Sequence, residues 1–87
     1  MPKRRGQDHV AQCFGLMLGR LRAQRGWTLA DVARASGMHA TYLGILEDGR
    51  NTPSLNTLFK LADVFGIDVL DFVREIAADR KARQRTQ

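Results

Sequence analysis

The side chains best suited to catalysis or metal binding, Cys13, His9 and His39, are spread along the first half of the chain. Metal sites bring Cys and His ligands together at short, fixed spacings, and these three residues have no such spacing. The sequence also contains no Gly-rich phosphate loop, no recognisable carboxylate pair and no nucleophile–base set. We therefore predict a protein that is not an enzyme and uses no cofactor or metal. Cys13 is expected to pack in or near the core, with redox sensing as the less favoured alternative.

Binding of a polyanion is the chemistry that the charges favour instead. The chain has 14 Lys and Arg against 9 Asp and Glu, a net charge of +5. Half of the basic residues lie in the two ends: Lys3, Arg4, Arg5, Arg80, Lys81, Arg83 and Arg85. Basic ends often bind nucleic acid, although they can also serve only to keep a protein soluble. We expect a basic N-terminal arm over 1–6, a folded domain over 7–78 and a basic, disordered tail over 79–87.

Length and composition predict a single soluble domain. The 87 residues, 44% of them apolar, have room for one small core. A lone cysteine fits a reducing compartment. No apolar stretch of signal-peptide length follows the charged start, and none approaches the roughly 20 residues of a membrane span. We therefore expect a cytoplasmic protein.

The elements that must position any binding residues are helices. Apolar residues recur at three- and four-residue steps, and no alternating strand pattern competes with them. The predicted fold class is all-α, with five helices over about 8–25, 28–36, 40–48, 54–65 and 68–78. In the fourth helix the expected inner face is Leu55, Leu58, Phe59, Ala62 and Phe65.

Local signals mark where these helices begin and which positions within them are unusual. Thr28 to Asp31 has the spacing of a capping box, and Ser54 is predicted to cap the fourth helix. Gly15 and Gly19 weaken the first helix, and we expect them to be exposed positions that the helix tolerates, with a small-residue contact as the alternative.

The second and third predicted helices have the spacing of a helix-turn-helix. Two helices that cross steeply need a small residue at their closest approach, which Ala33 supplies. They also need a residue that tolerates positive φ in the turn, which Gly37 supplies. Val32, Leu43 and Leu46 are spaced to pack between the two helices.

A family resemblance agrees with this motif. The segments LRxxRGWT, VAxxSG, YLxxLEDGR and PSLxTLxKLA follow one another between residues 14 and 72. In these features the chain resembles the phage-repressor and Cro-like helix-turn-helix regulators of the xenobiotic-response-element class, which are bacterial or phage proteins. The resemblance implies a compact five-helix lambda-repressor-like domain that binds double-stranded DNA as a homodimer, with residues 39–48 in the major groove. Among small members, the stretch TYLxxLEDGRN is most similar to restriction–modification controllers.

The resemblance also implies roles for individual residues. Arg22 and Glu47 fall where the family forms an ion pair between the first and third helices. Contacts to DNA phosphates are expected from Thr28, Leu29, Tyr42, Arg50, Asn51, Ser54 and Asn56. Leu29 replaces the glutamine that is common at this position, which removes one expected side-chain contact. Tyr42 as a half-buried core aromatic, and Arg50 with Asn51 as a solvated turn, are the alternatives.

The recognition helix that the resemblance implies is unusually poor in polar side chains. Base contacts are expected from His39, Ala40, Thr41, Gly44 and Ile45. Thr41 and His39 can hydrogen-bond to base edges, whereas Ala40 and Ile45 can make only apolar contacts, for which the thymine methyl group is the major-groove partner. We expect Gly44 to permit close approach of the backbone. The prediction is a T-rich half-site of modest specificity, supported by phosphate contacts and DNA shape.

The last predicted helix has more apolar residues than one small core needs. A homodimer interface is expected from Val69, Leu70, Phe72, Val73 and Ile76, with inward packing of all five as the alternative. A different function remains open, in which the chain keeps this fold as a protein-interaction module and reads DNA weakly. The apolar recognition helix favours this alternative, and the basic ends oppose it.

Overall fold

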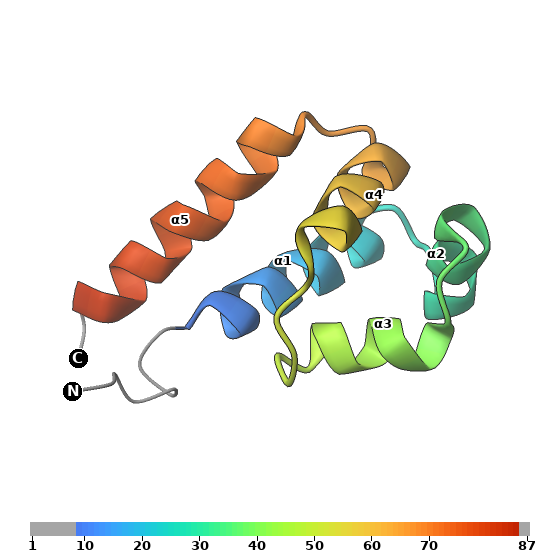
Figure 1. The fold of residues 1–87 in the computed structure, drawn as a ribbon, viewed down its shortest axis with the longest axis horizontal. Helices are drawn as coiled ribbons and strands as arrows, with labels where there is room; N and C mark the ends of the chain where they lie inside the picture. Colours follow the sequence, from blue (N-terminus) through green and yellow to red (C-terminus); the bar gives the residue numbers. More distant parts are fainter. Residues whose placement is uncertain (1–8, 86–87) are drawn as a thin grey trace.

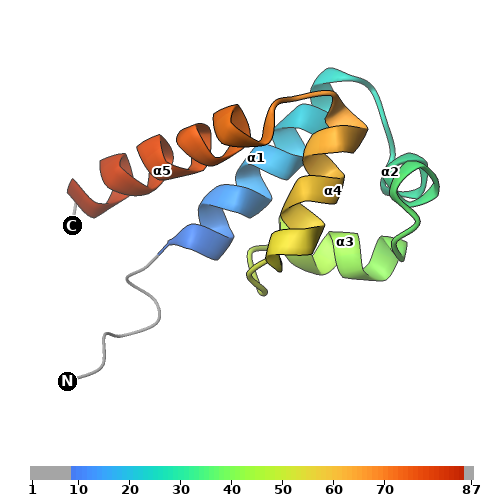
Figure 2. The same cartoon turned by 45° about the horizontal axis from the view of Figure 1, so that its top comes forward.

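Five α-helices without a strand make up residues 9–85, which are the residues that the computed structural model describes. The helices are α1 (Val10–Gln24), α2 (Leu29–Ser36), α3 (Ala40–Glu47), α4 (Leu55–Phe65) and α5 (Val69–Arg85). α1 and α4 lie in the middle of the molecule, with α2 and α3 on one side of them and α5 on the other (Figure 1, Figure 2). The predicted all-α, five-helix fold is confirmed. The expected N-terminal arm over residues 1–6 lies outside the described residues.

The predicted helix starts are present in the structure. The Thr28 hydroxyl accepts a hydrogen bond from the Asp31 N–H at 3.1 Å, and the Thr28 N–H donates to the Asp31 carboxylate at 2.8 Å, which completes the capping box of α2. The Ser54 hydroxyl accepts from the Thr57 N–H at 3.0 Å and caps α4. Because these bonds span only three residues, the local sequence is enough to predict them.

α5 is longer than the sequence analysis predicted. The helix continues to Arg85, so the expectation of a disordered tail is wrong for residues 79–85. This segment contains no Gly or Pro to stop the helix, and its Ala, Lys, Arg and Gln residues are strong helix formers. The Arg83 Nε lies 3.3 Å from an Asp79 carboxylate oxygen, one turn away on the same helix. The basic end of the chain is therefore carried on a helix.

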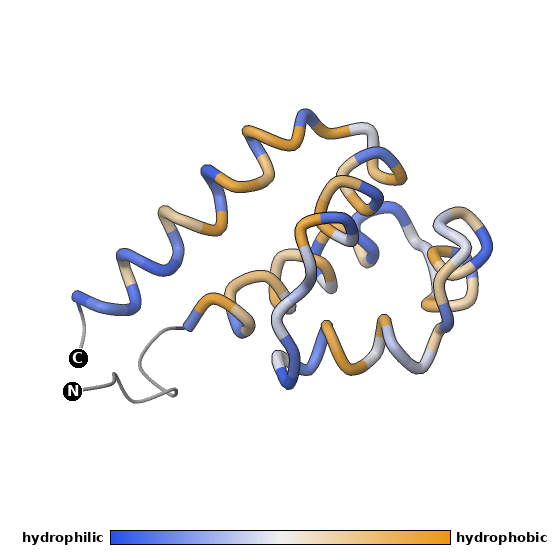
Figure 3. The backbone as a smooth tube through the Cα atoms, in the orientation of Figure 1, coloured by the Kyte–Doolittle hydropathy of each residue, from blue (hydrophilic) through white to orange (hydrophobic). Residues whose placement is uncertain are grey.

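The core is built from all five helices. The fully buried side chains include Phe14 of α1, Val32 of α2, Leu43 and Leu46 of α3, Leu61 of α4 and Phe72 of α5. Phe14 and Phe72 meet edge to face with ring centroids 6.1 Å apart, which joins α1 to α5. Figure 3 shows hydrophobic residues along α1, α4 and the first half of α5, whereas the last turns of α5 are mainly hydrophilic.

Gly15 is a buried contact point between α1 and α3, not the exposed position that we expected. A Cβ at this position would lie 2.5 Å from the Leu46 carbonyl oxygen and 2.6 Å from the Glu47 carbonyl oxygen. Only a residue without a side chain therefore lets the two helices approach this closely. A Cβ at Gly19, one turn later, would meet only the Glu47 carboxylate at 3.6 Å.

Candidate nucleic-acid interface

The turn between α2 and α3 holds the two helices at a fixed angle. Gly37 has φ of 76°, and its N–H donates to the Ala33 carbonyl at 2.8 Å. The Met38 N–H donates to the Ser36 hydroxyl at 3.2 Å. Buried Val32 packs in the same core cluster as Leu43 and Leu46 of α3. These apolar contacts hold the inner face of α3 against the core.

The exposed surface of α3 is concentrated at its N-terminal end. His39, Ala40 and Thr41 are all exposed, whereas Ile45 is half-buried. His39 is the N-cap residue, but its side chain makes no capping hydrogen bond. Three of the five residues expected to contact bases therefore lie together at the start of the helix with accessible side chains.

Gly44 faces α2. A Cβ at Gly44 would lie 3.7 Å from Cδ1 of Leu29, and Leu29 itself packs against the core cluster. The glycine makes room for the Leu29 side chain. The position of Gly44 therefore does not favour the close approach of the α3 backbone to DNA that we expected. Because the Leu29 side chain lies between the two helices, only its backbone N–H can serve an anion.

The N-terminus of α2 combines helix N–H groups with a carboxylate. The N–H groups of Leu29 and Ala30 have no acceptor within the helix, which makes this end attractive to an anion. The Thr28 N–H bond lowers the pKa of Asp31, with a smaller effect from the Arg34 side chain. Asp31 is therefore ionised at neutral pH, and its ion pair with Arg34 partly offsets its negative charge beside the N–H groups.

A second helix N-terminus is tied to α3 through hydroxyl groups. The Tyr42 hydroxyl lies 3.5 Å from the Thr57 hydroxyl, which accepts a hydrogen bond from the Ser54 hydroxyl at 3.0 Å. Thr57 is buried and was missed by the sequence analysis, although its place three residues after Ser54 is a recognisable capping spacing. Tyr42 is half-buried and joins α3 to the start of α4.

The α3–α4 loop and the first turn of α4 together carry most of the polar residues expected to contact phosphate. Arg50, Asn51, Ser54 and Asn56 are all exposed. The Arg50 guanidinium lies 3.5 Å from the Asp48 carboxylate, and both side chains are well exposed, so this pair contributes little to stability. Arg50 can exchange this partner for another anion at small cost.

The end of α3 is anchored to α1 by an ion pair. Arg22 donates through Nε to Glu47 Oε2 at 2.6 Å and through Nη2 to Oε1 at 3.0 Å. Its Nη1 donates to the Trp27 carbonyl at 2.9 Å, so the guanidinium also holds the chain that leads into α2. The carboxylate raises the pKa of Arg22 further. This pair fixes the position of α3 and leaves no charge for a ligand.

The five apolar residues of α5 expected at a dimer interface divide into two groups. Phe72 is fully buried, so the expectation is wrong for this residue, and Val69 and Ile76 are partly buried against the core. Leu70 and Val73 remain 62% and 43% exposed. After the turn at Gly66, one side of α5 packs against α1. Leu70 and Val73 lie outside this contact and are exposed.

α4 adds two exposed apolar residues that the sequence analysis placed inside. Leu55 is 71% exposed and Phe59 is 50% exposed. A helical stripe of five apolar residues is wider than the contact that α4 makes with the core, so its edge remains outside. Exposed apolar side chains thus lie on both α4 and α5.

Two further properties concern the described residues 9–85. Within this range no three Cys, His, Asp or Glu side chains are grouped as they would be around a metal ion. None of its helices has both the length and the apolar character needed to cross a membrane.

A helix-turn-helix whose second helix has an exposed N-terminal end is the architecture of DNA-binding regulators. The helix-turn-helix family HTH_3 matches residues 18–72, more than half of the chain, and the protein belongs to this family of DNA-binding transcriptional regulators.

Individual relatives agree with this assignment. The chain is 44% identical over 59 residues to the HTH-type transcriptional regulator DdrOP3 of Deinococcus deserti, a match that covers 68% of this chain but only 46% of that regulator. The clp gene regulator ClgR from Corynebacterium glutamicum has a similar structure, with a TM-score of 0.79 and 30% identity over 88% of this chain and 82% of that one. The restriction-modification controller protein C.AhdI from Aeromonas hydrophila gives a TM-score of 0.66 and 32% identity over 76% of this chain and 94% of that one.

Proposed function

We propose that the protein is a sequence-specific regulator of transcription in the cytoplasm, which binds a palindromic or pseudo-palindromic operator as a homodimer and has no catalytic activity. In this proposal α3 enters the major groove and His39, Ala40 and Thr41 face the bases, with Ile45 at the edge of the contact. The observation that carries the proposal is the exposed start of α3, flanked by the N-termini of α2 and α4. Leu29 links the first of these ends to α3, and Thr57 links the second.

The two helix N-termini supply the backbone contacts. At each end the first N–H groups, those of Leu29 and Ala30 in α2 and of Leu55 and Asn56 in α4, have no acceptor within the helix. N–H groups of this kind bind phosphate oxygens and are favoured by the helix dipole. Phosphate contacts set the register of α3 on the duplex but do not read sequence.

The homodimer follows from the operator geometry and from the exposed apolar surface. Two half-sites one turn apart place two copies of α3 about 34 Å from each other. Leu55, Phe59, Leu70 and Val73 are exposed apolar residues of the kind that a self-associating surface buries. The similarity to C.AhdI, at 32% identity and a TM-score of 0.66, supports a regulator of the restriction–modification controller type.

Binding to random-sequence duplex DNA at two salt concentrations tests the proposal. Each phosphate contact releases counterions, so affinity must fall steeply as salt rises. No binding at low salt would contradict DNA recognition and would favour the protein-interaction module instead. Selection of bound sequences from a random duplex pool would then give the half-site, its symmetry and its spacing. A site without a repeated half would contradict the palindromic operator.

A further inference from the structure

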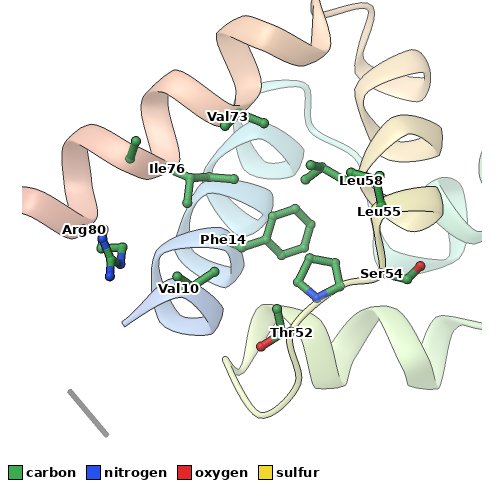
Figure 4. Close-up of a pocket in the computed structure, with 11 residues that line it drawn as sticks. Val10, Phe14, Thr52, Ser54, Leu55, Leu58, Val73, Ile76 and Arg80 are labelled. Atoms are coloured by element: carbon green, nitrogen blue, oxygen red, sulfur yellow. The ribbon is translucent and has the colours of Figure 1, made fainter. Parts of the chain in front are cut away.

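Three hydroxyl groups at the junction of α3 and α4 form one chain of hydrogen bonds. The Ser54 Oγ lies 3.0 Å from the Thr57 Oγ1, which lies 3.5 Å from the Tyr42 Oη. Thr57, in the middle, is only 9% exposed, whereas Ser54 is exposed and Tyr42 is half-buried. The Ser54 side chain points away from the apolar groove that opens between α1, α4 and α5 (Figure 4). The three hydroxyl groups therefore lie on the side of the α4 N-terminus that faces α3, not on the side of the groove.

The number of protons sets the direction of each bond. A hydroxyl group has one proton to donate and two lone pairs that accept. The Ser54 Oγ accepts the Thr57 N–H at 3.0 Å as the cap of α4, and it donates its one proton to the Thr57 Oγ1. The proton of Thr57 remains, and a buried donor needs an acceptor. The Tyr42 Oη is the next oxygen of the chain and can accept it, which leaves the Tyr42 proton to point elsewhere.

We infer that Thr57 is a positioning residue, which uses the Ser54 proton inside the protein and turns the Tyr42 hydroxyl proton outward as a donor to a DNA phosphate. This role rests on the proposed binding of DNA and specifies how its backbone contact is made. Ser54 and Tyr42 are both expected to contact phosphate, but only one of these two hydroxyl groups keeps a proton for an outside acceptor. Tyr42 is the side chain that donates, and Ser54 is the cap that holds Thr57 in place.

The Tyr42 hydroxyl is suited to an anion. Its ring packs against the core cluster, so the position of the oxygen is set before DNA arrives. A hydroxyl group that accepts one hydrogen bond donates a stronger one, because the bonds of a chain polarise each other. The N–H groups of Leu55 and Asn56, at the start of the same helix as Thr57, have no acceptor within that helix. A phosphate held by these N–H groups has further oxygen atoms that accept the Tyr42 proton.

Neutron diffraction from crystals of the deuterated protein tests the direction of the bonds without DNA. Neutrons locate the deuterium atoms of hydroxyl groups, so the order of donors and acceptors is observed directly. We expect the Ser54 deuterium on the line to the Thr57 Oγ1, and the Thr57 deuterium on the line to the Tyr42 Oη. A Tyr42 deuterium directed at Thr57 would overturn the inference, because that hydroxyl group would have no proton left for a phosphate.

A matched pair of variants at Thr57 tests the effect on DNA binding. Thr57→Val keeps the shape of the side chain and loses the hydroxyl group, whereas Thr57→Ser keeps the hydroxyl group. Thr57→Val should raise the Kd for random-sequence duplex at low salt about threefold or more, and Thr57→Ser should stay within about twofold of wild type. Fluorescence anisotropy measures the Kd, and circular dichroism checks that each variant is folded. If Thr57→Val does not fold, the neutron structure and the Tyr42→Phe variant decide the question.

A double-mutant cycle separates the alignment of Tyr42 from a general disturbance of α4. Tyr42→Phe alone should raise the Kd about fivefold, since it removes one hydrogen bond to a charged group. In that background Thr57→Val should raise the Kd by less than a further factor of about 1.5, because the hydroxyl group that it aligns is already absent. An equal effect of Thr57→Val with and without the Tyr42 hydroxyl would overturn the role of Thr57.

The salt dependence of binding identifies the kind of contact that Tyr42 makes. Tyr42 is uncharged, so Tyr42→Phe should weaken binding by the same factor at two salt concentrations, whereas Arg50→Ala should reduce the salt slope by about one. A reduced slope in Tyr42→Phe would overturn Tyr42 as a single uncharged donor. Wild-type protein that does not bind duplex at low salt would overturn the proposed function together with this role. Wild-type binding that Tyr42→Phe leaves unchanged would overturn this role alone.

Discussion

The Arg22 guanidinium and the Glu47 carboxylate form a bidentate ion pair, with N–O distances of 2.6 and 3.0 Å, that joins α1 to the last residue of α3. The two side chains are only 25% and 15% exposed. The third arm of the guanidinium reaches the Trp27 carbonyl, so a single residue holds both the recognition helix and the entry to α2. The orientation of α3 therefore depends on a charge pair that lies outside the surface proposed for DNA contact.

Loss of one partner of this pair should destabilise the fold. Arg22→Met leaves the Glu47 carboxylate half-enclosed without its cation, and we expect a loss of about 2 kcal/mol, less than for a fully buried pair because both groups retain some solvent. Urea denaturation measures the change. The double variant Arg22→Met with Glu47→Leu should lose less free energy of unfolding than the two single variants lose together. Strict additivity would mean that the two groups do not interact.

Gly15 and Gly19 form a matched pair for the contact between α1 and α3. Gly15→Ala places a Cβ against two backbone oxygens and should cost about 1–3 kcal/mol of stability. Gly19→Ala has room and should be neutral or stabilise the helix by up to about 1 kcal/mol. Thermal unfolding of the two variants side by side is the measurement. Equal melting temperatures of the two variants would mean that α1 and α3 can move apart at no cost in stability.

The capping box of α2 predicts a pH dependence. Because the folded-state pKa of Asp31 is lowered, its contribution to stability is present above the unfolded-state pKa of about 4 and is lost as pH falls through the folded-state value. Asp31→Asn should therefore lower the melting temperature at pH 7, and the difference from wild type should shrink toward pH 2.5. Asp63→Asn on the exposed side of α4 is the control. If the difference in melting temperature between Asp31→Asn and wild type is the same at pH 7 and pH 2.5, the Asp31 carboxylate is not the source of that difference.

Sequence preference is assigned to the start of α3. Thr41→Ala removes one hydroxyl and one methyl group from the surface proposed to face the bases, and it should reduce discrimination at one base pair by about 1 kcal/mol or more. Asn56→Ala should instead weaken binding to all duplexes alike, since its expected contact is to phosphate. Fluorescence anisotropy with a panel of single-base operator variants separates the two effects. Unchanged preference in Thr41→Ala would place readout elsewhere.

The helical end of α5 should protect the buried thiol of Cys13. Burial, and the neighbouring Asp79 carboxylate, raise the pKa of Cys13, so the reactive thiolate is scarce at neutral pH. Removal of residues 79–87 should speed thiol–disulfide exchange at Cys13 about tenfold or more, because it exposes the sulfur and takes away that carboxylate. Reaction with a chromogenic disulfide at pH 7.5 measures the rate. Equal rates in the full and shortened chains would mean that residues 79–85 do not cover α1.

The features that the sequence by itself determined are local ones. The capping box at Thr28 and Asp31, the Ser54 cap and the positive φ of Gly37 depend on residues within three or four positions of one another, and a helix forms or ends there whatever its neighbours are. The spacing of Val32, Leu43 and Leu46 likewise predicts their inward packing, since all three lie near the centre of an apolar stripe.

Tertiary structure decided which edge of each stripe is covered and which distant groups meet. An apolar stripe spans more than 100° of a helix, and only the position of the neighbouring helix determines that Phe72 is buried while Leu70 and Phe59 are exposed. The contact of Gly15 with Leu46 joins residues that are remote in sequence, and no local pattern contains it. The exposed surface of α3 depends on local and on long-range interactions. Local signals form the helix, and long-range packing determines which of its residues are exposed.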